Sequence, residues 1–206
     1  MNQVPFAMPQ LTEDRYNDVC LYLGEEYQSV ARHSYAVAVE AKRLAERFDE
    51  DQRAAEIAGL LHDISAVIPN EKRIDLAESL DIDVLHSERK LPMIIHQKLS
   101  KYMAKELFGI NDETILSAIE CHTTLKKEYS RLDLIVFLAD KIKWDRPGEP
   151  PYLSELLTAL DRSLEEAALI YLDYLFNSKP VVIHPWATDA QEKLREQTDK
   201  GKTAYL

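Results

Sequence analysis

Four histidines and two aspartates occur along the sequence in an order that a metal site can use. They are His33, His62, Asp63, His96, His122 and Asp140. Imidazole nitrogen and carboxylate oxygen are good ligands for Fe, Mn, Co, Ni or Zn, and the set contains no thiolate of the kind found in structural zinc sites. These residue types therefore indicate metal chemistry.

The adjacent pair His62 and Asp63 lies in the apolar segment GLLHDISAVIP. Burying a carboxylate and an imidazole in such a segment costs several kcal/mol unless the groups are paired or bind a cation. A lone His-Asp pair is as often structural as functional. The four further residues of the series favour metal binding here.

Six ligands exceed the needs of one catalytic ion, so the pattern indicates two ions. Asp63 can offer one oxygen to each ion. The other ligands then divide into His33, His62 and Asp140 for the first ion and His96 and His122 for the second. Two ions about 3.5 to 4 Å apart can hold a bridging hydroxide and a phosphoryl oxygen. Phosphate hydrolysis is the predicted chemistry, with Asp63 and His62 as the catalytic residues.

Helices are expected to position these ligands. Residues 33–48 place Val37, Ala41 and Leu44 on one apolar stripe, which is typical of an amphipathic helix. Residues 51–66 begin with Asp51, a good N-cap, and are apolar nearly all round, which predicts a central helix. Only five glycines accompany abundant Ala, Leu, Glu and Lys, so the chain is predicted to be all-α.

The same periodicity predicts a helical bundle of about eight or nine helices around a buried metal site. Further helices are expected at 70–80, 95–108, 111–122, 131–143, 152–176 and 185–198, with Gly109 left-handed at a helix end. Residues 81–93 lack periodicity and predict a loop or partly helical lid. Residues 1–10 form an N-terminal arm, and 11–200 form a single domain that includes the C-terminal helices of 152–198.

The net charge of −11 argues against nucleic acid and anionic membranes as partners. A local group of metal ions and basic side chains can still attract a small phosphorylated substrate. No apolar run approaches the roughly 18 to 20 residues of a membrane span, and the first residues do not resemble a signal peptide. With Cys20 and Cys121 as its only cysteines, the protein is expected in the cytoplasm.

The ordered ligands make the sequence similar to the HD superfamily of metal phosphohydrolases. More narrowly, HSYAVAVEAKRLAERF, AAEIAGLLHDISAVIP, IIHQKLSKYMAKELFGI, AIECHTT, LIVFLADKI and IHP resemble the YqeK family of symmetrical bis(5′-nucleosyl)-tetraphosphatases. This resemblance covers about residues 30 to 190. It implies an all-helical HD domain, a di-metal site that favours iron, cleavage of diadenosine tetraphosphate into two ADP, and a homodimer.

The sequence departs from that family near the predicted substrate entrance. Gln97 stands where the family usually has Gly, and Leu125 where a small residue tends to follow His-Thr-Thr. The segment KIKWDRPGEPPYL replaces a Glu-Pro-x-Arg type of sequence, with Arg146 in the role of the arginine. We expect four residues to bind substrate: Arg146 and Lys141 by neutralising phosphate, Thr123 and Thr124 by hydrogen bonding.

Other interpretations remain open from the sequence alone. An HD phosphohydrolase could instead act on a nucleoside monophosphate, a dNTP or a cyclic dinucleotide, and a metal-dependent nucleotide-binding module would show no turnover. A di-iron oxygenase on the same scaffold would consume oxygen. His86 is expected in an exposed loop, His184 as a packing or capping residue before Pro185, and Cys121 as a buried filler.

Overall fold

The computed structural model describes residues 11, 12 and 14–203, and over this range the chain contains α-helices and 3₁₀ (η) helices but no strand. The all-α prediction is confirmed. The expected arm at residues 1–10 lies outside the described residues. The elements are α1 (Arg15–Leu23), η1 (Glu25–Tyr27), α2 (Gln28–Arg47), α3 (Gln52–Leu61), η2 (Ile64–Val67), η3 (Asn70–Lys72), α4 (Arg73–Ser79), α5 (His86–Lys90), α6 (His96–Glu106), α7 (Glu113–Cys121), α8 (Arg131–Ile142), α9 (Leu153–Leu160), α10 (Leu164–Asn177) and α11 (Pro185–Thr203).

The described range thus holds eleven α-helices where about eight or nine were expected. One addition is α1, and another is α5, which lies inside the 81–93 segment. A third arises because the helix expected over 152–176 is two helices. The backbone of Ser163 is extended, and its side chain accepts the amide hydrogen of Glu166, which caps α10. A new helix therefore starts there.

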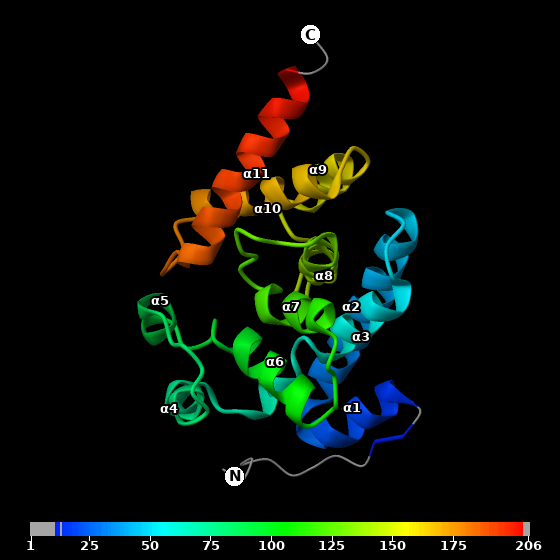
Figure 1. Ribbon diagram of the computed structural model, residues 1–206, viewed down its shortest axis with the longest axis vertical. Coiled ribbons are helices and arrows are strands. Elements are labelled where there is room, and N and C mark those ends of the chain that lie inside the picture. Colours follow the sequence, from blue (N-terminus) through cyan, green and yellow to red (C-terminus); the bar gives the residue numbers. More distant parts are fainter. Residues whose placement is uncertain (1–10, 13, 204–206) are drawn as a thin grey trace.

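The helix α8 passes through the middle of the fold and packs against α2, α3, α7 and α10 (Figure 1). Its residues from Leu132 to Ala139 are all buried. Ser130 and Asp133 form a capping box at its start. Asp140 follows this apolar run directly, so the packing of α8 determines how deeply Asp140 lies in the protein.

The helices α2 and α3 approach each other closely at Gly59. A Cβ atom at this position would lie 2.6 Å from the Ala38 Cα and 2.8 Å from the Ala38 nitrogen. No residue other than glycine fits there without moving a helix. The contact brings the helix that carries His33 next to the helix that ends at His62.

The 81–93 segment and α11 are held to α6 by a buried polar cluster, which is formed by Glu88, Lys98 and His184. The ammonium of Lys98 lies 2.9 Å from Glu88 and 2.8 Å from the carbonyl oxygen of Asp83, and His184 Nε2 lies 3.4 Å from Glu88. All three side chains are almost fully buried.

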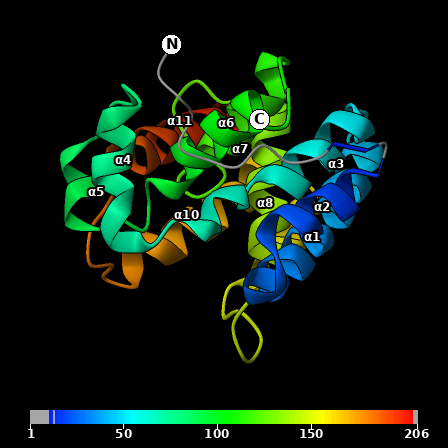
Figure 2. The same cartoon turned by 90° about the horizontal axis from the view of Figure 1, so that it is seen from below.

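Figure 2 shows α4 and α5 on one side of the molecule and α1 to α3 on the other.

None of the described helices has the length and the apolar character that crossing a membrane requires.

Candidate metal centre

The six predicted ligands come together where the ends of several helices meet. His62 and Asp63 follow α3, His96 begins α6, and His122 follows α7. His33 lies within α2 and Asp140 near the end of α8. Helix ends suit this task because their backbone groups are free to orient side chains.

The two carboxylate oxygens of Asp63 face two different groups of histidines. Its Oδ1 lies 3.1 Å from His96 Nε2 and 3.6 Å from His122 Nε2, whereas Oδ2 lies 3.4 Å from His62 Nε2. The carboxylate therefore stands between the groups, as a residue shared by two ions must.

Asp140 completes the group around His62. Its Oδ1 lies 3.0 Å from His33 Nε2 and 3.6 Å from His62 Nε2. The ligand atoms of His33, His62 and Asp140 all lie within 4.8 Å of one another, and the same holds for His62, Asp63 and His122. Each group is compact enough to surround one ion, but the two groups share His62, and His96 belongs to neither.

Backbone carbonyl groups orient three of the histidines in the same manner. The Nδ1–H group of His62 donates to Gly59, that of His96 to Met93 and that of His122 to Ile119, over 2.8, 2.6 and 2.8 Å. This bonding leaves the Nε2 lone pair of each ring directed into the centre, which is the usual arrangement for metal-bound histidine.

These lone pairs give a test of whether the residues fit a cation. His96 Nε2 and His122 Nε2 lie 2.9 Å apart, although both rings already use their Nδ1 protons elsewhere. His62 Nε2 is buried and forms no hydrogen bond with a described residue, while Asp63 Oδ2 and Asp140 Oδ1 lie 3.4 and 3.6 Å from it. Two facing lone pairs and an unsatisfied buried nitrogen are costly unless a positive charge lies among them. The donor set therefore fits divalent metal.

The ionisation of the cluster in the protein without metal supports the same conclusion. Burial lowers the pKa of His62, but the negative charges of Asp63 and Asp140 outweigh burial and raise it to about 10. Burial lowers the pKa of His122 to about 4, opposed by Asp63 and aided by His62. Burial raises the pKa of both carboxyl groups, yet neighbouring positive charge and hydrogen bonds bring each well below its usual value. Both aspartates are therefore ionised, as candidate metal ligands need to be.

Two cavities open from this centre. One has a volume of about 310 Å³ and is lined by five of the six candidate ligands, with Arg73, Met93, Thr123, Lys141, Trp144, Arg146, Tyr152 and Tyr171. The other, of about 390 Å³, lies along the first part of α2 and is lined by Ser29, Val30, Arg32 and Lys143 among others. His33, Asp63, Trp144 and Asp145 belong to both.

The four predicted substrate residues occupy different environments. Lys141 lines the first cavity, but its ammonium lies 2.6 Å from Asp140 and 3.3 Å from the carbonyl oxygen of His122. Attraction to Asp140 outweighs the effect of burial and raises the pKa of Lys141. Its charge therefore already has a partner within the protein.

Arg146, Thr123 and Thr124 differ in whether their polar groups are accessible from the cavity. Arg146 is exposed, lines the first cavity and lies 5.3 Å from the centre of the Trp144 ring. Thr123 lines this cavity too, with its hydroxyl 3.3 Å from His96 Nε2. The hydroxyl of Thr124 is buried and bonded to the carbonyl oxygen of Leu125.

Gln97 and Leu125 do not line the substrate entrance, so that prediction is wrong. Both are fully buried. The Gln97 amide donates to Thr124 Oγ1 and accepts from the Thr123 backbone N–H. Gln97 therefore stabilises the turn after His122, whereas Leu125 has a positive φ of 57°, a conformation that is unfavourable for residues other than glycine.

The other predictions for single residues can be compared with their surroundings. His86 is exposed, but it begins α5 and does not lie in a loop. His184 is buried and its Nδ1 accepts the Trp186 amide hydrogen, which confirms the capping role before α11. Cys121 is buried, and burial raises the pKa of its thiol well above the usual value. As a filler it is inert.

Arg73 and two tyrosines are cavity residues that the sequence did not reveal. Arg73 begins α4, a helix expected to be exposed, and lines the cavity beside Asp63. Tyr152 and Tyr171 pack edge to face at 5.0 Å and line the side near Lys141. No local pattern distinguishes these residues, because only the tertiary fold brings them to the cluster.

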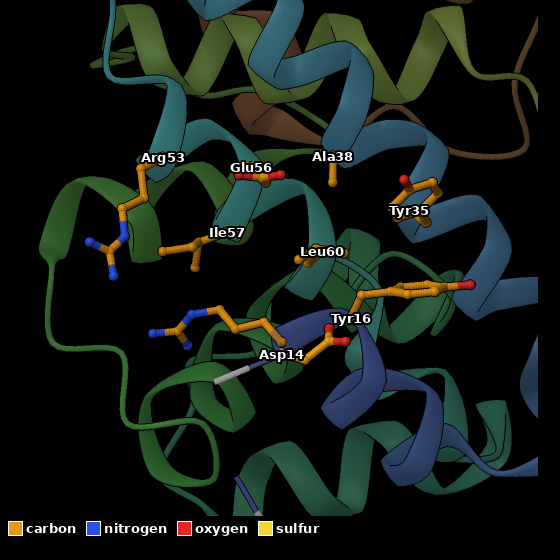
Figure 3. Close-up of a pocket in the computed structure, with 9 residues that line it drawn as sticks. Asp14, Tyr16, Tyr35, Ala38, Arg53, Glu56, Ile57 and Leu60 are labelled. Atoms are coloured by element: carbon orange, nitrogen blue, oxygen red, sulfur yellow. The ribbon is translucent and has the colours of Figure 1, made fainter. Parts of the chain in front are cut away.

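A larger hollow of about 530 Å³ lies between α1, α2 and α3 (Figure 3). Its lining includes Tyr16, Tyr35, Arg53 and Glu56 but none of the candidate ligands. Glu56 is paired with Lys42, and Tyr16 and Tyr35 pack on each other with ring centres 4.6 Å apart. The cavity of about 310 Å³, which five of the six candidate ligands line, is therefore the candidate functional site.

Known proteins share this sequence and fold. Residues 30–145 match the sequence model of the HD domain. An uncharacterised protein in the pepC 5′ region of Lactococcus lactis subsp. cremoris is 55% identical over 141 residues, 68% of this chain and 72% of that protein. The symmetrical bis(5′-nucleosyl)-tetraphosphatase of Halalkalibacterium halodurans is 30% identical over 194 residues, 92% and 94% of the two chains.

A solved structure is also similar. It is the crystal structure of a Clostridium acetobutylicum protein described as a predicted HD superfamily hydrolase involved in NAD metabolism. The two folds agree with a TM-score of 0.80 at 29% sequence identity, covering 93% of this chain and all of the other.

Proposed function

The chain belongs to the HD-domain family, and from this premise we propose that it is a metal-dependent phosphohydrolase that cleaves diadenosine tetraphosphate symmetrically into two ADP. One observation carries the proposal: the two oxygens of Asp63 face separate histidine groups, at 3.1 and 3.6 Å on one side and 3.4 Å on the other. A carboxylate placed in this way suits a pair of ions that act on one phosphate.

Divalent metal bound at this centre supplies the Lewis acidity that activates water and stabilises negative charge on a phosphoryl oxygen. The residues of the chain orient and tune it. The carbonyl groups of Gly59, Met93 and Ile119 fix the histidine rings, and Lys141 holds Asp140 in place. We assign Lys141 as a positioning residue on this basis, with Thr123 and Arg146 left as the groups free to contact substrate.

The shape of the site supports a substrate with two nucleoside ends. The cavities of about 310 and 390 Å³ meet at His33, Asp63 and Trp144, so that each could take one half of a dinucleoside polyphosphate. If divalent metal is held beside His33 and Asp63, which line both cavities, a phosphate chain that spans the two cavities would be cleaved near its middle. Relatives from Halalkalibacterium halodurans and Bacillus subtilis carry the name of this activity.

The nature and the number of the ions belong to the same proposal. We infer two ions from the separate histidine groups that face the two oxygens of Asp63, and iron is favoured by the family resemblance, with Mn, Co, Ni or Zn as alternatives. The single domain over 11–200, the homodimer and the cytoplasmic location stay predictions.

The test is to incubate anaerobically purified, iron-loaded protein with diadenosine tetraphosphate and to identify the products by chromatography. ADP as the only product supports symmetrical cleavage, whereas AMP with ATP would retain a phosphohydrolase but exclude this cleavage position. The variant Asp63→Ala should lose bound metal and turnover together. Asp189→Ala, which removes an exposed carboxylate on α11, is the matched control and should keep both.

Absence of turnover with metal bound would overturn the proposed substrate. The same protein is then given a nucleoside monophosphate, a dNTP, a cyclic dinucleotide and NAD, the last because the Clostridium protein is described as involved in NAD metabolism. Cleavage of one of these would identify another HD phosphohydrolase. Recovery of uncleaved nucleotide with metal present would indicate a binding module instead.

A further inference from the structure

The guanidinium of Arg73 is held at the wall of the metal cavity by backbone carbonyl groups. Its Nε donates to Ile68 over 3.1 Å and its Nη1 to Met93 over 3.3 Å. These two bonds fix the plane of the group. They use only two of its five N–H donors and leave Nη2 without a partner among the described residues.

The charge of Arg73 is not neutralised within the part of the chain that the structure describes. Its nitrogens form no ion pair with a described carboxylate, although the side chain is half-buried. Burial lowers the pKa of Arg73, with attraction to Asp63 acting in the opposite direction. An arginine stays charged at neutral pH even so. Burying part of a guanidinium without pairing it to a carboxylate costs free energy, and a bound anion would offset this cost.

Arg73 is attached to a defined part of the metal centre. The Met93 carbonyl oxygen that it contacts also accepts the Nδ1 proton of His96. Arg73 therefore belongs to the side of the cluster formed by His96, His122 and Asp63. Lys141 belongs to the other side, where Asp140 takes up its charge.

We propose that Arg73 binds a phosphate group of the substrate on the His96 side of the metal centre, next to the phosphate that is cleaved. The inference rests on the proposed function and extends it to a residue that sequence patterns did not identify. A guanidinium suits this task because its fixed N–H groups match phosphate oxygens in two-point contacts.

A preference for chains of several phosphates follows from this assignment. Arg146 comes after α8, which carries Asp140, whereas Arg73 is joined through Met93 to His96. The two free cations are thus linked to different ligand groups of one cavity. A nucleoside monophosphate could engage one of them at a time, and a polyphosphate could engage both.

The first experiment measures binding without turnover. Metal-loaded wild type, Arg73→Gln, Arg73→Lys and Lys72→Gln are titrated with ADP and with inorganic tripolyphosphate by calorimetry. Loss of a charge-assisted bond weakens binding about ten- to a hundredfold, so Arg73→Gln should show this loss. Arg73→Lys should recover part of the affinity. Lys72→Gln removes one exposed positive charge from the neighbouring position and should bind as wild type does.

The second experiment separates binding from structural support of His96. Metal content and unfolding temperature of Arg73→Gln should match those of wild type, and KM for diadenosine tetraphosphate should rise more than kcat falls. Loss of metal in this variant would overturn the proposal, because Arg73 would then act by positioning His96 through Met93. Unchanged affinity for ADP and tripolyphosphate would overturn it as well.

The two proposals can fail separately. If wild type binds tripolyphosphate through Arg73 but leaves diadenosine tetraphosphate intact, the inference stands and the proposed substrate falls. If wild type cleaves diadenosine tetraphosphate and Arg73→Gln does so with the same KM, the proposed function stands and the inference falls.

Discussion

The close approach of α2 and α3 at Gly59 makes a test of how the fold supports the metal centre. In Gly59→Ala the new Cβ would lie 2.6 Å from the Ala38 Cα, where ordinary contacts begin at 3.4 Å, so the helices must separate by about 0.8 Å. His62 is doubly affected, because it follows α3 and its Nδ1 donates to the Gly59 carbonyl oxygen. His33 lies on the other helix.

The size of the effect follows from two opposing terms. Overpacking of a core costs about 1 to 3 kcal/mol, and a clash with backbone atoms of Ala38 places Gly59→Ala in the upper part of that range, at about 2 to 3 kcal/mol. Alanine gains roughly 1 kcal/mol over glycine within a helix. The expected net loss is about 1 to 2 kcal/mol, a decrease in Tm of roughly 2 to 8 °C for a chain of this length. A shift of about 1 Å between catalytic ligands lowers turnover on the order of a hundredfold.

Circular dichroism gives Tm, elemental analysis gives metal content, and product formation gives turnover. The control is Gly109→Ala, at a position with φ of 66° and no atom within 4 Å of the new Cβ. Left-handed strain there costs about 1 to 2 kcal/mol but moves no ligand, so metal and turnover should remain. A Gly59→Ala protein with wild-type stability and full metal would refute the reasoning.

Three further predictions concern charge and metal. Lys141→Met should weaken metal affinity about ten- to a hundredfold by freeing Asp140, measured by metal titration; an increased KM with unchanged metal affinity would instead make Lys141 a substrate ligand. Removal of metal by a chelator should lower Tm by roughly 5 to 11 °C when metal had been present at about 100 times its Kd, and added iron should restore it. Glu88→Gln should cost about 3 kcal/mol at pH 7, because it breaks the buried pair with Lys98. Burial raises the pKa of Glu88, but His184, the Leu85 amide and Lys98 lower it below 4.5 overall. The stability that the Glu88 carboxylate contributes is therefore present above pH 4.5 and is lost as the pH falls through its folded-state pKa. Denaturant unfolding of both proteins at several pH values should show the difference shrinking in acid, and a constant difference would contradict the assignment.

The six candidate ligands stay a prediction, but four of them lie at positions that their local pattern marks. His62 and Asp63 end an apolar helix, and His122 ends another, so a polar residue at the buried end of an apolar run was visible without tertiary information. Asp140 after the apolar run of α8 is the same case. Such patterns predict that a residue is buried, whereas the tertiary fold determines that the six side chains lie close together.

Errors arose where a boundary depended on one side chain or where burial depended on distant segments. The break between α9 and α10 was visible in retrospect, because Ser163 followed by Glu166 is a helix-start pattern, but the apolar periodicity on both sides concealed it. The burial of Gln97 had no local mark, because it depends on the turn that contains Thr123 and Thr124. Arg73 was hidden for the same reason.

Charge balance explains how an acidic chain can hold a polyphosphate. The net charge of −11 describes the whole chain, whereas the cavity combines three carboxylates, Asp63, Asp140 and Asp145, with Lys141, Arg73 and Arg146. Lys141 is paired with Asp140. Burial lowers the pKa of His62, but Asp63 and Asp140 together raise it to about 10, so these carboxylates attract positive charge strongly. Divalent ions held by these residues would add positive charge to the cavity, where Arg73 and Arg146 form no ion pair with a described residue. A small phosphorylated substrate can be attracted by this local charge although the chain as a whole is acidic.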